Sequence, residues 1–160
     1  MRAWVVGLAM LAAACSKGGG DNTSRAAAPA QSTANACSLV TADEAQKLLG
    51  GSAKLLEQNG GAAGYDQCQY MREGEHIADM STLTLQRLPV TLAAKRQALT
   101  ENGDKFEEVG GVGDGAVWVP GMSFLYVAHG GETLVASVAS NAADTKTKSI
   151  ELARLALPRM

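Results

Sequence analysis

Hydrophobic and polar residues divide the chain into three stretches with different patterns. An apolar run, Ala3–Ala14, comes first, and a stretch of small and polar residues, 16–36, follows it. From residue 37 onward, apolar residues recur at the spacing of helices and strands, which is typical of a folded domain. The pattern therefore predicts a single domain over 37–160, preceded by two segments of a different kind.

Three segments of this domain have helical patterns. Thr41 and Glu44 have the spacing of a capping box, and Gly50 can adopt the left-handed conformation that ends a helix. Asp144 is the expected N-cap of the last helix, because a carboxylate there can accept from the first backbone N–H groups. The expected helices are Thr41–Leu49, Thr91–Asn102 and Thr145–Leu157.

Alternating and continuous apolar runs predict strands between these helices. Both faces of Phe124–Val127 and Leu134–Ala136 are apolar, which favours central strands covered by helices on at least one side. The sequence thus predicts an α+β fold, with an antiparallel sheet of about five strands packed against two or three helices. The candidate strands are Tyr65–Met71, Ile77–Leu88, a short Lys105–Val109, Ala116–Val119, Ser123–His129 and Glu132–Ser140.

The first apolar run has the features of a secretory signal peptide, because Arg2 precedes it and small residues end it. Its twelve residues would span only about 18 Å as a helix, less than the roughly 30 Å core of a bilayer. Its end, Leu11-Ala12-Ala13-Ala14-Cys15, resembles the lipobox of bacterial lipoproteins, with Ala12 where that family most often has Leu. The resemblance implies cleavage before Cys15 and acylation of that residue.

An ordinary signal peptide cut after another alanine is the alternative, and it would leave Cys15 as a free thiol or remove it. We expect a signal peptide over 1–14, a lipidated cysteine and flexible tether over 15–36, and the α+β domain over 37–160. The 21 residues after Cys15 would reach about 25 Å. The expected partner of this segment is therefore a membrane, held through the N-terminal lipid.

Charge and composition exclude one class of partner. The formal net charge is −2 and aromatic residues make up 4% of the chain, so the chain has neither the basic field nor the stacking side chains that nucleic acid binding needs. We expect no nucleic acid partner.

The chain has three cysteines, an odd number for an exported protein. If Cys15 is lipidated, Cys37 and Cys68 remain as an even pair in an oxidising compartment, which favours a disulfide. A metal pair or a redox pair are the other interpretations. The first would need more ligands close by, and the second usually has Cys-x-x-Cys spacing, which the chain lacks.

Residues that carry chemistry are few. His76 and His129 lie near predicted turns, and Met71, His76 and Met80 together would suit a soft metal such as copper. No Gly-x-Ser-x-Gly elbow frames a serine, so we expect neither an enzyme nor a cofactor. The glycine-rich 110–115 lacks the lysine of a nucleotide loop and leads into a strand, which predicts a tight turn before Trp118.

Several motifs together resemble a group of small bacterial envelope lipoproteins of unknown function. They are Cys37-Ser38-Leu39-Val40-Thr41-x-x-Glu44, Cys68-Gln69-Tyr70 and Gly111-Val112-Gly113-Asp114-x-Ala116-x-Trp118. The resemblance implies a fold like the extrinsic P protein of photosystem II, a curved antiparallel sheet between helices, and paired domain cysteines. In a Gram-negative host it also implies the periplasmic face of the outer membrane, because Ser16, and not Asp, follows Cys15.

The expected function is that of a lipid-anchored cell-envelope protein with a non-catalytic binding domain. Its ligand would be an envelope protein or a small apolar molecule, bound on the sheet or between the sheet and its helices. The alternative is an envelope metal-binding protein or enzyme that uses His76 and the nearby methionines.

Overall fold

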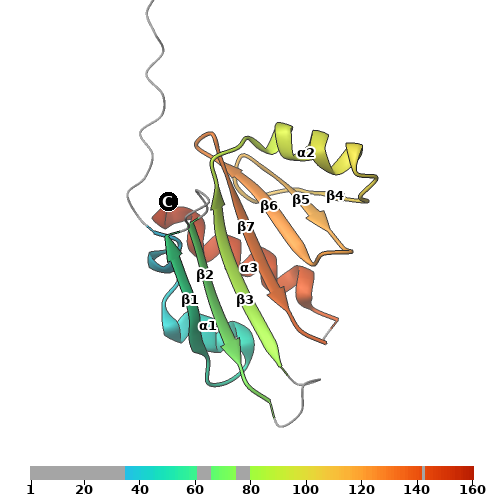
Figure 1. Cartoon of the computed structure of the whole chain (residues 1–160). Helices are drawn as coiled ribbons and strands as arrows, with labels where there is room; N and C mark the ends of the chain where they lie inside the picture. The colour runs from blue at the N-terminus through green and yellow to red at the C-terminus, as the bar shows by residue number, and fades with distance from the viewer. Residues whose placement is uncertain (1–34, 61–65, 75–79, 142) are drawn as a thin grey trace, which may run out of the picture.

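The computed structural model describes residues 35–60, 66–74, 80–141 and 143–160. These residues form an antiparallel sheet with helices on both faces (Figure 1). In chain order the elements are the 3₁₀ turn η1 (Ala36–Ser38), α1 (Ala42–Leu49), β1 (Lys54–Gly60), β2 (Asp66–Arg72), β3 (Ser81–Leu88), α2 (Leu92–Glu101), β4 (Glu107–Val109), β5 (Gly115–Val119), β6 (Phe124–His129), β7 (Glu132–Ala139), α3 (Thr145–Ala156) and η3 (Leu157–Arg159).

The sheet has seven strands in the order β1-β2-β3-β7-β6-β5-β4, and every neighbouring pair is antiparallel. The α+β class is confirmed, but the prediction of about five strands is wrong. Six of the seven strands overlap the six candidate segments of the sequence, and the one that was missed is β1, an edge strand whose register shifts between Leu55 and Glu57. Leu55 and Leu56 are both exposed, so the sequence of β1 has no alternation that would reveal a buried face.

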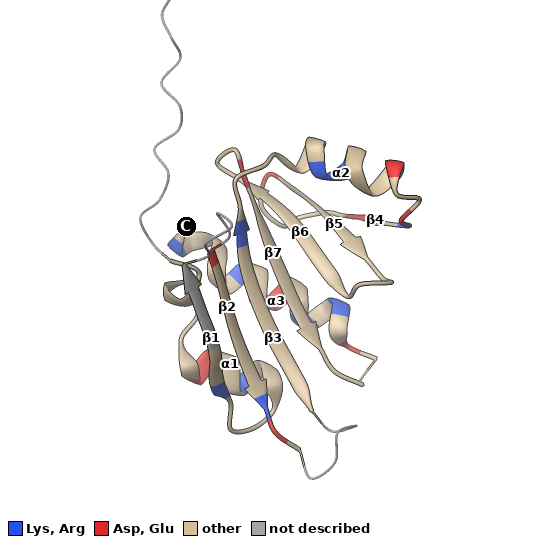
Figure 2. Ribbon diagram, viewed as in Figure 1, with Lys and Arg blue, Asp and Glu red and all other residues tan. Residues whose placement is uncertain are grey.

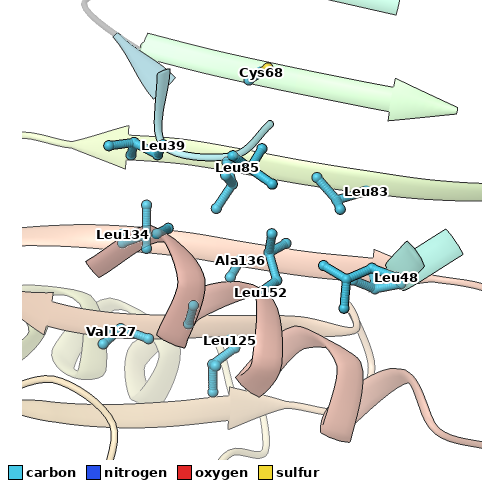
Figure 3. Close-up of a cluster of buried hydrophobic side chains, with 14 of the residues drawn as sticks. Leu39, Leu48, Cys68, Leu83, Leu85, Leu125, Val127, Leu134, Ala136 and Leu152 are labelled. Carbon is cyan, nitrogen blue, oxygen red and sulfur yellow. The ribbon is translucent and has the colours of Figure 1, made fainter. Parts of the chain in front are cut away.

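One face of the sheet is closed by η1, α1 and α3, and this side holds the larger core (Figure 3). Leu83 and Leu85 of β3 point into it, as their alternation with threonines predicts. Leu48 of α1 and Leu152 of α3 reach the same layer from the helix side. Burial of these leucines, each worth roughly 1.5–3 kcal/mol, fixes both helices on this face.

The predicted start and stop of α1 are confirmed. The backbone N–H of Glu44 donates to Thr41 Oγ1 at 3.3 Å, and the N–H of Thr41 donates to Glu44 Oε2 at 2.8 Å. Gly50 ends the helix with φ +75°. At α3 the prediction is only half right, because Asp144 precedes the helix but makes no capping hydrogen bond. Its carboxylate instead lies 3.2 Å from Lys148 Nζ.

The glycine-rich segment before β5 is a turn, as predicted. Hydrogen bonds connect it to the hairpin formed by β6 and β7. Gly113 has φ +57°, and a Cβ there would lie 2.5 Å from the carbonyl oxygen of Ala128. The N–H of Asp114 donates to that same oxygen at 2.9 Å, and Asp114 Oδ2 accepts from the N–H of Gly130 at 3.1 Å. The close approach requires glycine at position 113.

Arg159, next to the C-terminus, is bonded to the first residues of the domain. Both terminal nitrogens of Arg159 donate to the Glu44 carboxylate at 2.7 Å, and Nη1 also donates to the carbonyl of Leu39 at 3.0 Å. This fork lowers the pKa of Glu44 from its ordinary 4.5 to about 2, with the hydrogen bond from the backbone of Thr41 as the next cause. The contact joins η3 to α1.

Among the residues that the structure describes, only α2 covers the other face of the sheet, and it does so in part. α2 crosses it at one end and buries Leu92 and Leu99 against a second, smaller cluster that includes Tyr126 and Val135 (Figure 1). Odd and even positions of β6 thus enter different cores. Leu125 and Val127 are buried in the larger core, and Tyr126 is buried in the smaller one. The prediction that these doubly apolar strands are central and covered is confirmed.

Candidate functional site

A groove of about 400 Å³ lies between α2 and the sheet. Its floor is a row of cross-strand neighbours, Gln86 of β3 beside Val135 of β7 beside Tyr126 of β6. Six of its eight lining residues are apolar or aromatic, which is the usual character of a small-molecule site. The lining comprises Gln86, Leu88, Val90, Ala94, Lys95, Ala98, Tyr126 and Val135.

The local sequence explains why the groove stays open. After Pro89 the chain turns, Thr91 Oγ1 accepts from the N–H of Ala94 at 3.3 Å, and α2 starts above the sheet. Ala94 and Ala98 lie one helical turn apart on the side facing the groove. Because these positions carry only methyl groups, α2 does not fill the space above the floor.

The ammonium group of Lys95 lies over the aromatic ring of Tyr126, which forms part of the groove floor. Lys95 Nζ lies 4.6 Å from the centroid of the Tyr126 ring, a cation–π distance. Phe124 packs edge-on against the same ring, with centroids 6.1 Å apart. Burial raises the pKa of Tyr126, and the charge of Asp104 raises it further, so the phenol is neutral at physiological pH. The site therefore presents an apolar surface with one positive charge.

Beyond the groove, the part of the same sheet face formed by β2 and β3 carries uncharged polar side chains. Gln67 and Gln69 of β2 and Thr82 and Thr84 of β3 are half-buried there, with Gln69 Nε2 3.4 Å from Thr84 Oγ1. Charged residues of β2 and β3 stand near the strand ends, and the middles of these strands carry none (Figure 2). The groove thus opens onto a neutral polar surface.

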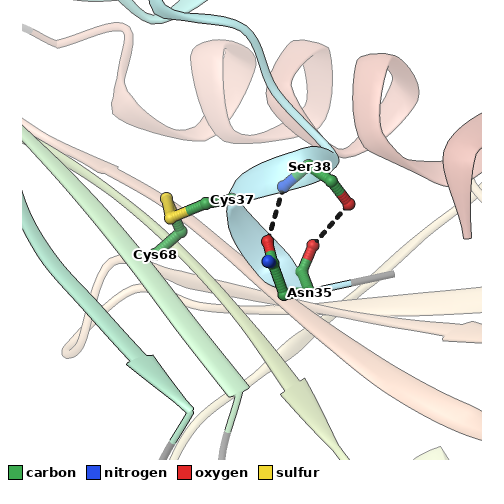
Figure 4. The surroundings of a disulfide bond; sticks show 4 residues. All are labelled: Asn35, Cys37, Ser38 and Cys68. Carbon is green, nitrogen blue, oxygen red and sulfur yellow. Dashed lines mark hydrogen bonds between the residues drawn. A yellow bond between two sulfur atoms is a disulfide. The ribbon is translucent and has the colours of Figure 1, made fainter. Parts of the chain in front are cut away.

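The two predicted domain cysteines are joined. Cys37 of η1 and Cys68 of β2 form a disulfide with an S–S distance of 2.01 Å and Cα atoms 4.9 Å apart (Figure 4). Asn35 caps η1, its Oδ1 accepting from the N–H of Ser38 at 3.0 Å. Cys68 is fully buried in the larger core, so the bridge attaches the entry of the domain to the closed face of the sheet.

Several predicted residues lie outside the described part of the chain. Cys15 and nearly all of the expected tether belong to this group, as does His76. Met71 lies half-buried on β2, Met80 is exposed just before β3, and His129 is half-buried at the end of β6. Within the described ranges no cluster of three or more His, Cys, Asp or Glu side chains is placed to hold a metal ion.

No helix within residues 35–60, 66–74, 80–141 and 143–160 has the length and hydrophobicity needed to cross a bilayer. No family model, curated protein or solved structure matches this chain. The resemblance to small envelope lipoproteins therefore stays a prediction, and the case for function rests on the groove.

Sequence reasoning missed the groove itself. It predicted a helix over Thr91–Asn102, but gave no reason for two alanines, Ala94 and Ala98, at i and i+4 within it. Small residues at that spacing are the only local signal of a space beneath the helix. Its floor comes from β3, β6 and β7, whose adjacency is not evident from any one segment.

Proposed function

We propose that this protein is a lipid-anchored cell-envelope lipoprotein whose domain is a non-catalytic binding module, with the groove beneath α2 as its binding site. The observation that carries the proposal is the half-covered sheet face, which leaves about 400 Å³ of mainly apolar space beside a helix. Ligand sites usually measure about 300–1,000 Å³ and combine apolar walls with a few polar groups. The groove has this size and composition.

The chemistry of the lining supports binding and not catalysis. Lys95 and Tyr126 are its only ionisable residues, and the ring of Tyr126 faces the ammonium of Lys95. A nucleophile paired with a general base, as hydrolases use, is not among these eight residues. The function we assign to the site is recognition of a small molecule or of part of another envelope component.

The anchor is the second part of the proposal. Acylation of Cys15 would hold the domain on a tether at a membrane surface, on the periplasmic face of the outer membrane if the host is Gram-negative. Labelled palmitate should be incorporated by the wild type and lost in Cys15→Ser, whereas Cys37→Ser should keep the label. Absence of label in the wild type, or its persistence in Cys15→Ser, would disprove the anchor.

The binding site is tested by photo-crosslinking in intact cells. A photoreactive phenylalanine at Ala94, which lines the groove, should give an adduct of one defined mass. The same residue at the exposed Glu151 of α3, on the far side of the sheet, is the matched control and should give none. Equal products from the two positions, or none from either, would contradict a binding role for the groove.

A further inference from the structure

We propose that the groove binds a single-chain amphiphile with a carboxylate head group, its aliphatic chain lying along the floor and its carboxylate paired with Lys95. This assignment rests on the proposed function, since it names the ligand class for the same groove. Three features point to this ligand class: Lys95 has no carboxylate partner among the described residues, the groove has an apolar rim, and its volume is about 400 Å³.

Lys95 stands apart from the neighbouring cation on the same helix. Arg96 Nη2 lies 2.6 Å from Glu108 Oε2 of β4, so its charge is neutralised within the protein. Lys95 is half-buried, and within the described residues it forms no ion pair with a carboxylate. Its ammonium lies over Tyr126 at the groove, where a bound anion would complete the pairing.

None of the described residues that line the groove carries a negative charge. The polar residues among those that line the groove are Lys95, Tyr126 and Gln86. The side-chain amide of Gln86 can donate a hydrogen bond to a carboxylate oxygen. The charge of Asp104 raises the pKa of the Tyr126 phenol, but Asp104 is not among the residues that line the groove. A negatively charged head group therefore meets one ammonium and one amide.

The apolar part of the groove calls for an aliphatic chain. Leu88 and Val135 lie under it, and Val90 at its rim is 41% exposed although it is a large apolar residue. Covering such surface with an aliphatic chain is favourable, because both apolar surfaces are removed from water. The volume of about 400 Å³ suits one chain of moderate length.

The count of charges favours a carboxylate over a phosphate monoester. A single lysine balances one negative charge, whereas a phosphate monoester carries about −1.5 to −2 at neutral pH. Phosphate sites also commonly use the planar fork of arginine, and the groove has none. The head group that fits Lys95 is thus a monocarboxylate.

The test uses the full chain with Cys15→Ser, exported and recovered without detergent, so that neither its own acyl chain nor a micelle competes for the groove. Isothermal titration would compare decanoate with decan-1-ol, decyl phosphate and decyltrimethylammonium. Decanoate should bind at least tenfold more tightly than decan-1-ol, because a hydrogen bond to a charged group adds that much affinity. The ammonium compound should bind worst.

Three variants, one of them a control, test whether the amphiphile binds in the groove. Lys95→Met keeps the apolar stem and removes the charge, so decanoate should lose tenfold or more in affinity while decan-1-ol is unchanged. Lys105→Met removes an exposed lysine that does not line the groove, and should change neither. Ala98→Trp should fill the space and abolish binding of both. Amide spectra check that each variant is folded.

Each outcome is decisive. Equal affinity for decanoate and decan-1-ol, tighter binding of decyl phosphate, or an unaffected Lys95→Met would overturn the carboxylate assignment. If no amphiphile binds but Ala94 still gives a defined adduct in cells, the ligand class is wrong and the proposed function stands. If both experiments fail, the binding role proposed for the groove is wrong as well.

Discussion

The two faces of the sheet are stabilised to different degrees. On the closed face α1, α3 and η1 bury 21 described residues in one cluster, and a disulfide and the Arg159–Glu44 fork fasten its elements. On the groove face, α2 is the one helix in the described part of the chain, and it lies over a cluster of seven buried residues. Its attachments to neighbouring strands are the exposed Arg96–Glu108 pair and the Lys95–Tyr126 contact.

We infer from this difference that the closed face provides most of the stability of the domain and that the groove face provides the binding surface. Regions that bind ligands tend to come from the less stable part of a structure, because access requires surface that is not fully packed. Here the closed face holds the sheet rigid, so the groove face can leave space under α2 without loss of the fold. Substitutions on the closed face should therefore lower stability, and substitutions at the groove should change binding.

A matched pair of leucines measures the two cores directly. Leu152 of α3 and Leu99 of α2 are 0% and 1% exposed, so Leu→Ala removes the same atoms from the same degree of burial. We expect Leu152→Ala to cost about 4 kcal/mol of unfolding free energy and Leu99→Ala about 2 kcal/mol, since a lone helix beside a groove can settle into the cavity. Urea denaturation gives both values.

Hydrogen exchange supplies the second readout for this pair. Leu99→Ala should speed exchange in α2 far more than in α3, because only the helix over the groove is loosened. Equal losses of stability in the two variants, with exchange raised throughout the sheet by both, would show that the faces form one cooperative core.

The disulfide should have the next largest effect, and only on the closed face. It closes a loop of 32 residues counted inclusively, given a sequence separation of 31. The chain-entropy relation then gives up to about 3.7 kcal/mol. The double variant Cys37→Ala, Cys68→Ala should lose most of this in oxidising buffer, measured by urea denaturation.

Reduction is the control for that measurement. With a strong reductant present, wild type and double variant should become nearly equal in stability, because the wild type then also lacks the cross-link. If the double variant is still less stable than the wild type after complete reduction, the lost unfolding free energy comes from packing of the buried Cys68 side chain. Affinity of the groove for decanoate should not change in the double variant, as η1 lies on the opposite face.

Features that depend on a few neighbouring residues were predictable from the sequence. The capping box of α1 spans three residues, and its hydrogen bonds form between Thr41 and Glu44 as predicted. The same holds for the left-handed Gly50 and for the turn around Gly113, whose conformations only glycine adopts easily. Asp144 shows the limit, because a nearby Lys148 attracts the carboxylate that would have capped α3.

Features that depend on distant segments were not predictable in the same way. β1 is recognised as a strand through its pairing with β2, since its own pattern has no buried face. The groove requires β3 to lie beside β7, a contact between residues about fifty positions apart in the chain, such as Gln86 and Val135. Only Ala94 and Ala98 gave a local sign that α2 leaves space beneath it.

The smallest predicted effect concerns acid and the Arg159–Glu44 fork. The pKa of Glu44 is lowered to about 2 in the folded protein, so its contribution to stability is fully present above about pH 4.5 and is lost as the pH falls toward 2. Because the Arg159 side chain is 38% exposed, water screens the pair, and we expect about 1 kcal/mol.

The Arg159→Gln variant tests the contribution of the fork. Between pH 5.5 and pH 2.5 it should lose about 1 kcal/mol less unfolding free energy than the wild type loses. Arg154→Gln, at an exposed position of α3, is the matched control and should follow the wild-type curve. Urea denaturation at the two pH values measures all three proteins. If Arg159→Gln and the wild type lose stability in parallel, the fork does not fasten the closed face. If they differ, acid weakens the junction of η3 with α1, and exchange in α2 should stay unaffected by the substitution because the fork lies across the sheet from the groove.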